Sequence, residues 1–172
     1  MNRIGHQAAA QAAWLGFCTG ERLLLHDSAL SWQHVLTGMV VASSMCADDW
    51  SPDSDQGGVM AKIIPGGHRG PTHMPELVAA VLFGLTHVVG DDLDWFVLAA
   101  AAAWGSHLFV DFFWGGIPFL IPTLFGHKKR IGTKLDTGGP AEHWMTLVLV
   151  TLAIPLGYVA FGGDIPASWI VS

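Results

Sequence analysis

Apolar segments with almost no charged residues recur along the whole chain, at residues 7–19, 29–47, 77–90, 93–115 and 144–162. Only 13% of the 172 residues are charged, which is about half the share found in an ordinary soluble domain. So few charges leave too little polar surface for a disordered chain or an ordinary soluble enzyme. We therefore expect a single domain, residues 1–172, that is all-α: a multi-pass transmembrane bundle of four or five helices.

The lengths of these segments determine which of them can cross a bilayer as a helix. A crossing takes about 20 helical residues and at least about 17. Residues 29–47, 93–115 and 144–162 meet this requirement, so each is expected to span. Residues 7–19 and 77–90 are short, and the sequence leaves open whether they cross fully.

The basic residues indicate the orientation of the bundle. If all five segments cross, residues 1–6, 48–75 and 116–142 share one side of the membrane, and seven of the eight basic residues lie there. Positive residues collect in cytoplasmic loops, so this side, with the N-terminus, is expected in the cytoplasm. The net charge of −6 argues against direct binding of nucleic acid.

His107 and Asp111 are the sharpest local signal for a site. Their i,i+4 spacing places both side chains on one face of the apolar segment 93–115. Ionisable residues inside a span are costly and usually functional, which favours two ligands of one metal ion. The alternative is a His–Asp hydrogen bond that joins two helices.

Two motifs in the polar stretch 48–75 add candidate ligands. Asp53 and Asp55 follow Pro52 in an extended segment, where alternate side chains point the same way. His68 and His73 can ligate a divalent metal, and Arg69 between them can hold an anionic oxygen. The alternatives are a solvated turn for the aspartates and a lipid-headgroup contact for Arg69.

The predicted topology brings these residues to one face of the membrane. His6 precedes the first segment and Glu142 precedes the last, so both join them at the cytoplasmic end. A set of histidines and carboxylates without cysteine favours Zn²⁺, with Mn²⁺ or Fe²⁺ as alternatives, and can hold two or three ions. Five other histidines are set aside, because they fall at the other face or lack a partner: His26, His34, His87, His127 and His143.

Several motifs in order along the chain support a family resemblance. They are Gly5-His6, Pro52-Asp53-Ser54-Asp55, His68-Arg69-Gly70-Pro71-Thr72-His73, Ser106-His107-Leu108-Phe109-Val110-Asp111, the run of residues 115–122, Lys129-Arg130 and Glu142. In these motifs the chain resembles the LexA-binding, inner-membrane-associated metal-dependent hydrolases of bacteria and phages. It departs from their pattern at Gln56, where His is common, and at Met74, where Ser is common.

The resemblance implies a helical membrane hydrolase of the inner membrane, distantly similar to zinc-dependent phospholipase C. It implies a metal-ligand set that comprises His6, Asp53, His68, His107 and Asp111, with Asp55, His73 and Glu142 as further candidates.

We expect a hydrolase that uses a metal-activated water on a phosphoester in a lipid or lipid-linked substrate. Asp55 or Glu142 would orient or deprotonate the water, and Arg69 would stabilise the developing charge. A second hypothesis is a non-enzymatic regulator that tethers a LexA-like repressor through the basic residues Lys128, Lys129 and Arg130. A third, a metal transporter or sensor, needs polar residues through the membrane depth, and only His34 and His87 suggest them.

Overall fold

The described residues of the computed structural model form five α-helices and one short 3-10 helix, without β-strands. They are residues 3–25, 30–46, 70–90, 93–119 and 130–164. The helices are α1 (Arg3–Leu25), α2 (Trp32–Ser44), η2 (Pro71–His73), α4 (Pro75–Thr86), α5 (Asp94–Phe113) and α7 (Pro140–Ala160). The predicted all-α fold is confirmed for this part of the chain.

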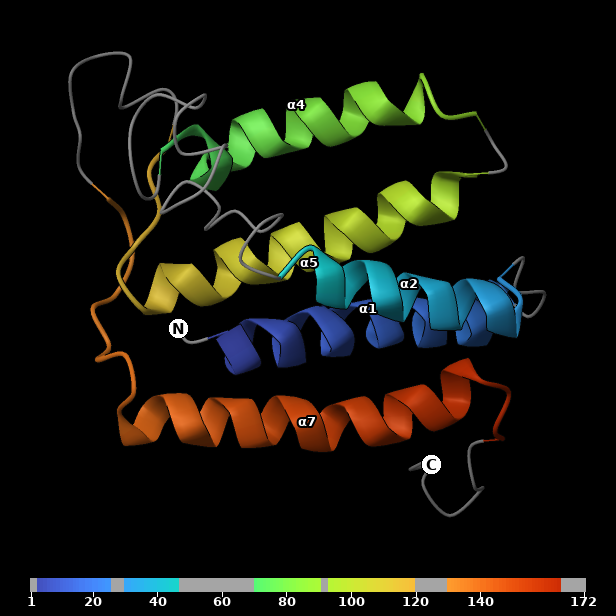
Figure 1. Cartoon of the computed structure of the whole chain (residues 1–172). Coiled ribbons are helices and arrows are strands. Elements are labelled where there is room, and N and C mark those ends of the chain that lie inside the picture. Colours follow the sequence, from blue (N-terminus) through green and yellow to red (C-terminus); the bar gives the residue numbers. More distant parts are fainter. Residues whose placement is uncertain (1–2, 26–29, 47–69, 91–92, 120–129, 165–172) are drawn as a thin grey trace.

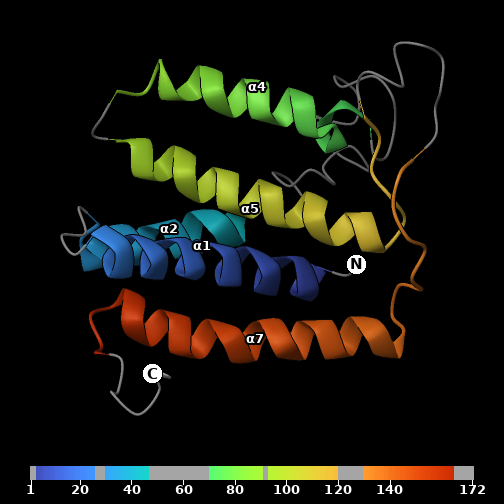
Figure 2. The ribbon, with the colours of Figure 1, turned by 180° about the vertical axis from the view of Figure 1, so that it is seen from behind.

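The helices lie side by side and alternate in direction (Figures 1 and 2). The first turns of α1, α4 and α7 and the last turn of α5 lie at one end of the bundle, which we call the proximal end (left in Figure 1). The opposite end is the distal end. This alternation agrees with the one inferred from loop charge.

Two helices, α5 and α7, are long and apolar enough to cross a membrane, judged by length and composition. Helix α1 is longer than the predicted segment 7–19, since it runs over 23 residues and includes charged residues at both ends. Helix α4 is short, as expected, with 12 residues.

The prediction that residues 29–47 form a spanning helix is wrong in length. Helix α2 has only 13 residues, which gives a rise of about 20 Å, less than the thickness of a bilayer core. Its N-terminus is fixed at Ser31, whose side chain forms a capping box with His34, and its last turn ends at Met45 and Cys46. The capping box and the turn therefore set the bounds of the helix inside the apolar run.

Trp14 of α1 is the centre of the main core. Its indole is fully buried, and Nε1 donates a hydrogen bond to the Val35 carbonyl of α2 at 2.9 Å. Gly38, one turn further along α2, lies against the indole ring. The close approach of α1 and α2 thus depends on a large residue on one helix and a glycine on the other. No disulfide joins the two buried cysteines, Cys18 and Cys46.

Residues 131–135 close the proximal end by pairing with the chain that follows α5. We call this segment the strap. Ile117 and Ile131 exchange two backbone hydrogen bonds of 3.0 Å, and the Thr133 amide donates to the Phe112 carbonyl at 2.9 Å. At Gly132 any side chain would overlap the Phe112 carbonyl. The strap therefore satisfies carbonyl groups that the end of α5 would otherwise leave without partners.

The Trp14–Gly38 contact predicts that one added methyl group at Gly38 lowers the stability of the fold. In Gly38→Ala the new Cβ would overlap an indole that is buried and held by a hydrogen bond. We expect the variant to lose about 1–3 kcal/mol of unfolding free energy, measured as a lower thermal midpoint in detergent. Gly84→Ala in α4 is the matched control, because its Cβ meets nothing within 4 Å. Equal midpoints for the two variants would contradict the packing described.

Candidate metal centre

Helix α5 presents His107 and Asp111 on one face, one turn apart, and both residues are 1% exposed. His6 comes from the first turns of α1 and is 2% exposed, and His73, the last residue of η2, is fully buried. Four of the predicted site residues therefore meet in the interior of the proximal end. They come from three elements that are far apart in the sequence.

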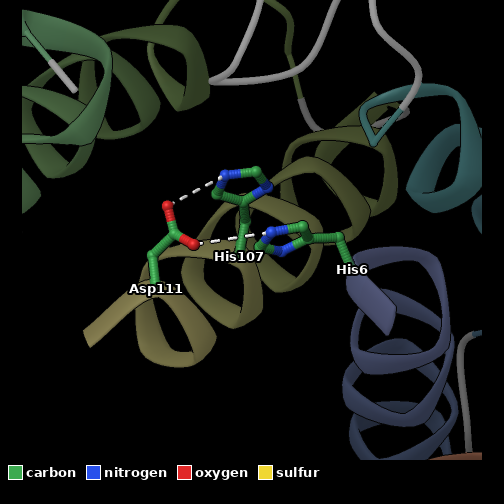
Figure 3. A group of neighbouring side chains, drawn as sticks. All are labelled: His6, His107 and Asp111. Carbon is green, nitrogen blue, oxygen red and sulfur yellow. Dashed lines mark ion pairs between the residues drawn. The ribbon is translucent and has the colours of Figure 1, made fainter. Parts of the chain in front are cut away.

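The three imidazoles surround the carboxylate of Asp111. His6 Nε2 lies 3.5 Å from Oδ1, while His73 Nε2 and His107 Nε2 lie 3.3 and 3.6 Å from Oδ2. The rings of His6 and His107 stack with centroids 3.8 Å apart and planes 13° apart. Figure 3 shows His6 and His107, each with one imidazole nitrogen directed at a different oxygen of Asp111.

These distances fit a shared metal ion better than direct hydrogen bonds. A charge-assisted N–H···O hydrogen bond is about 2.7–2.9 Å long, so all three separations are too long. With metal–ligand bonds of about 2.0–2.1 Å, neighbouring ligand atoms of a tetrahedral site lie about 3.3–3.4 Å apart. One ligand atom from each of His6, His107 and Asp111 lies within 4.8 Å of the others, and this buried group can hold a metal ion.

His73 is held in place by α5 itself. Trp104, one turn before His107, donates from Nε1 to the Thr72 carbonyl at 3.0 Å. Thr72 Oγ1 lies 3.1 Å from His73 Nδ1, so a proton on Nδ1 can be donated to the hydroxyl and leave Nε2 as a ligand atom. Sequence reasoning did not identify Thr72 or Trp104 as site residues. The only signals were the position of Thr72 beside His73 and that of Trp104 one turn before His107.

Glu142 is the other predicted site residue that the structure describes. It lies in the first turn of α7, at the proximal end, and its side chain is fully buried. Its Oε2 accepts a hydrogen bond from the Gly138 amide at 2.8 Å. Glu142 is thus a buried carboxylate at the same end of the bundle as the histidine cluster.

Several predicted residues lie outside the described residues: Asp53, Asp55, His68 and Arg69, together with Lys128 and Lys129. Of the histidines set aside, His34 and His87 lie at the distal end, at the start of α2 and after the end of α4. His143 lies at the proximal end but is exposed, and its Nδ1 lies 3.0 Å from the Gly139 carbonyl.

No family model matches the chain, and neither a curated protein nor a solved structure matches it.

The cluster predicts bound metal that depends on its own residues. Protein purified in detergent should carry a stoichiometric divalent transition metal by elemental mass spectrometry. The variants Asp111→Asn and His107→Gln have side chains of similar size and should lose the bound metal, because each removes a ligand from the buried group. His87→Gln, an exposed histidine outside the cluster, is the control and should keep it. If the folded wild-type protein neither contains metal nor takes up Zn²⁺ or Mn²⁺, the cluster is only a packing contact between helices.

The Thr72 hydroxyl gives a second and finer test. Thr72→Val keeps the shape but removes the partner of His73 Nδ1, and we expect metal affinity to fall about 10–100-fold, measured by competition with a chelating dye. Thr86→Val is a closely matched control, because Thr86 Oγ1 lies 3.2 Å from Nδ1 of the neighbouring His87 at the distal end. If both variants bind metal like the wild type, Thr72 does not orient a ligand.

Proposed function

We propose that the chain is a membrane-bound, metal-dependent hydrolase that acts on a phosphoester in a lipid or lipid-linked substrate. The observation that carries the proposal is the convergence of His6, His73 and His107 on the buried carboxylate of Asp111. Such a set is expensive to bury without an ion, because a carboxylate removed from water needs strong compensation.

The donor set favours Zn²⁺, with Mn²⁺ or Fe²⁺ as alternatives, because it consists of imidazoles and a carboxylate without thiolate. When bound, such an ion polarises a phosphoryl oxygen and lowers the pKa of a coordinated water toward neutrality. Both oxygens of Asp111 face imidazoles, so this carboxylate and the histidines around it would hold the ion together. Asp53, Asp55 and His68 are the candidate ligands for further ions.

Two further roles are the transfer of a proton from the water and the stabilisation of negative charge on the substrate. Glu142, buried at the same end as the cluster, is proposed to accept a proton from the attacking water, a role it shares with Asp55 as a candidate. Its hydrogen bond from the Gly138 amide fixes the direction of the carboxylate. Arg69 is proposed to stabilise the negative charge that develops on the phosphoryl oxygens.

The membrane location rests on α7 and its surface. Of the apolar window of α7, only 11% is buried inside the structure, whereas the core helix of a soluble protein is mostly buried. Side chains such as Leu147, Leu152 and Ile154 are about half exposed or more, and an exposed apolar surface of this kind fits lipid. A lipid substrate would reach the site without leaving the membrane.

The experiment is a hydrolysis assay with purified protein, supplied with Zn²⁺ or Mn²⁺, on phospholipid vesicles and on soluble phosphomonoesters and phosphodiesters. We expect turnover that Asp111→Asn abolishes together with metal binding. Glu142→Gln should retain metal and lower kcat by about 10²–10⁴-fold, the usual contribution of a general base. His87→Gln should behave as the wild type.

Failure to hydrolyse any of these substrates by protein with full metal content would exclude a phosphoesterase. Tethering of a cytoplasmic repressor would then be the leading hypothesis, and it assigns function to the basic residues instead of the metal site. Charge reversal at Lys128, Lys129 and Arg130 would abolish function, while Asp111→Asn would have no effect.

A further inference from the structure

A groove of about 570 Å³ runs between α1, α5 and α7. We propose that it holds one acyl chain of the substrate, an anionic glycerophospholipid whose phosphate lies at the level of the metal centre. This inference rests on the proposed function and adds to it the class of substrate and the place where its hydrocarbon lies.

The lining of the groove suits hydrocarbon and little else. Ala9, Ala12 and Val110 are buried small or branched residues of its floor, while Phe17 and Phe109 are exposed at its edge. Every lining residue is apolar except Ser106, and the Ser106 hydroxyl donates to the Ala103 carbonyl of its own helix at 2.9 Å. A polar headgroup would find no partner here, because burying it without hydrogen bonds is unfavourable.

The dimensions match a chain lying along the helices. The groove follows α5 from Leu98 to Val110, a distance of roughly 18 Å at 1.5 Å per residue. Its volume lies within the range of roughly 300–1,000 Å³ that is usual for ligand sites. A second groove between α4 and α5 is smaller, about 380 Å³.

The groove reaches the level of the candidate metal centre on two of the helices that carry candidate ligands, α1 and α5. Ala9 lies three residues after His6 on α1, and Val110 directly precedes Asp111 on α5. Ala9 and Val110 belong to one buried cluster. A chain lying over this floor therefore has its proximal end at the same depth as the turns that carry His6, His107 and Asp111.

Exposed charge at the same end, which comprises three basic side chains and the carboxylate of Asp136, favours an anionic headgroup. Of the four Lys and Arg residues that the structure describes, all are exposed, and three lie at the proximal end: Arg3, Arg130 and Lys134. The fourth, Arg22, is in the last turn of α1, at the distal end. The groove itself contains no charged residue. The acyl chain of the lipid would therefore lie along the bundle axis in the groove, with its charged headgroup beyond the proximal end of the groove.

The test uses phosphatidylglycerol with a photoreactive diazirine in the middle of one acyl chain, mixed into vesicles that contain the protein. After irradiation, mass spectrometry should find the label at groove residues such as Phe17, Leu98 and Met145. Ala13→Leu and Ala102→Leu fill the groove and should lower labelling by about tenfold. Ala79→Leu makes the same change in the smaller groove and should leave the labelling of these residues unchanged.

Two readouts separate this inference from misfolding and from catalysis. Thermal midpoints close to that of the wild type show that the leucine variants are folded. Labelling should persist in Asp111→Asn, because it needs no turnover. In hydrolysis, Ala102→Leu should raise KM for a long-chain substrate and leave a short-chain soluble phosphodiester unaffected.

The opposing results are distinct. Equal labelling of both grooves would mean ordinary lipid contact, and so would labelling that is unchanged in the leucine variants. Cross-links between copies of the chain through Phe17 or Met145 would mean that the groove is a subunit interface. Either overturns the inference. Hydrolysis of short-chain phosphodiesters without groove labelling would reject the groove and keep the hydrolase. Specific labelling of a protein that hydrolyses nothing would reject the hydrolase, and the acyl chain in the groove would not be that of a substrate.

Discussion

The buried carboxylate of Asp111 is the constraint on which the proximal end of this bundle depends. Removing a carboxylate from water costs several kcal/mol unless charge or hydrogen bonds replace the lost hydration. Here three imidazoles on α1, η2 and α5 surround the carboxylate, and the metal ion proposed between them would supply that compensation. All three elements must therefore place a histidine at the same depth. The strap, which satisfies the carbonyls of Phe112 and Phe113 next to Asp111, keeps the end of α5 in the position that this arrangement requires.

Helix α1 must also keep its register, because a shift of one turn moves a residue by about 5.4 Å and would take His6 away from Asp111. Side chains that donate to carbonyls of neighbouring helices fix this register. Gln11 donates to Met39 at 2.7 Å, Trp14 to Val35 at 2.9 Å and Thr19 to Leu156 at 2.8 Å. In the proposed bilayer location the hydrophobic effect would not drive helices together, and such contacts with close packing of small residues would supply the association.

The parts of this structure that could be predicted from the sequence are those encoded locally or by charge. The spacing of His107 and Asp111 fixes a common face on one helix, and loop charge alone predicted the alternation that brings His6 and His73 to the same end. The apolar run overestimates the length of α2, because the Ser31 capping box that starts the helix lies inside that run. Trp104–Thr72 and the strap could not be predicted, because they join residues far apart in sequence that no periodicity relates.

Helix α5 carries two kinds of surface at once, and this division gives the proposed function its geometry. His107 and Asp111 face the interior, while Leu98, Ala102 and Phe109 lie on the opposite side of the helix and line the groove. Helix α5 is therefore both the source of two ligands and one wall of the apolar groove. Because the strap and Trp104 hold its proximal half, the same rigid element would set the depth of the proposed acyl chain and the depth of the candidate metal centre.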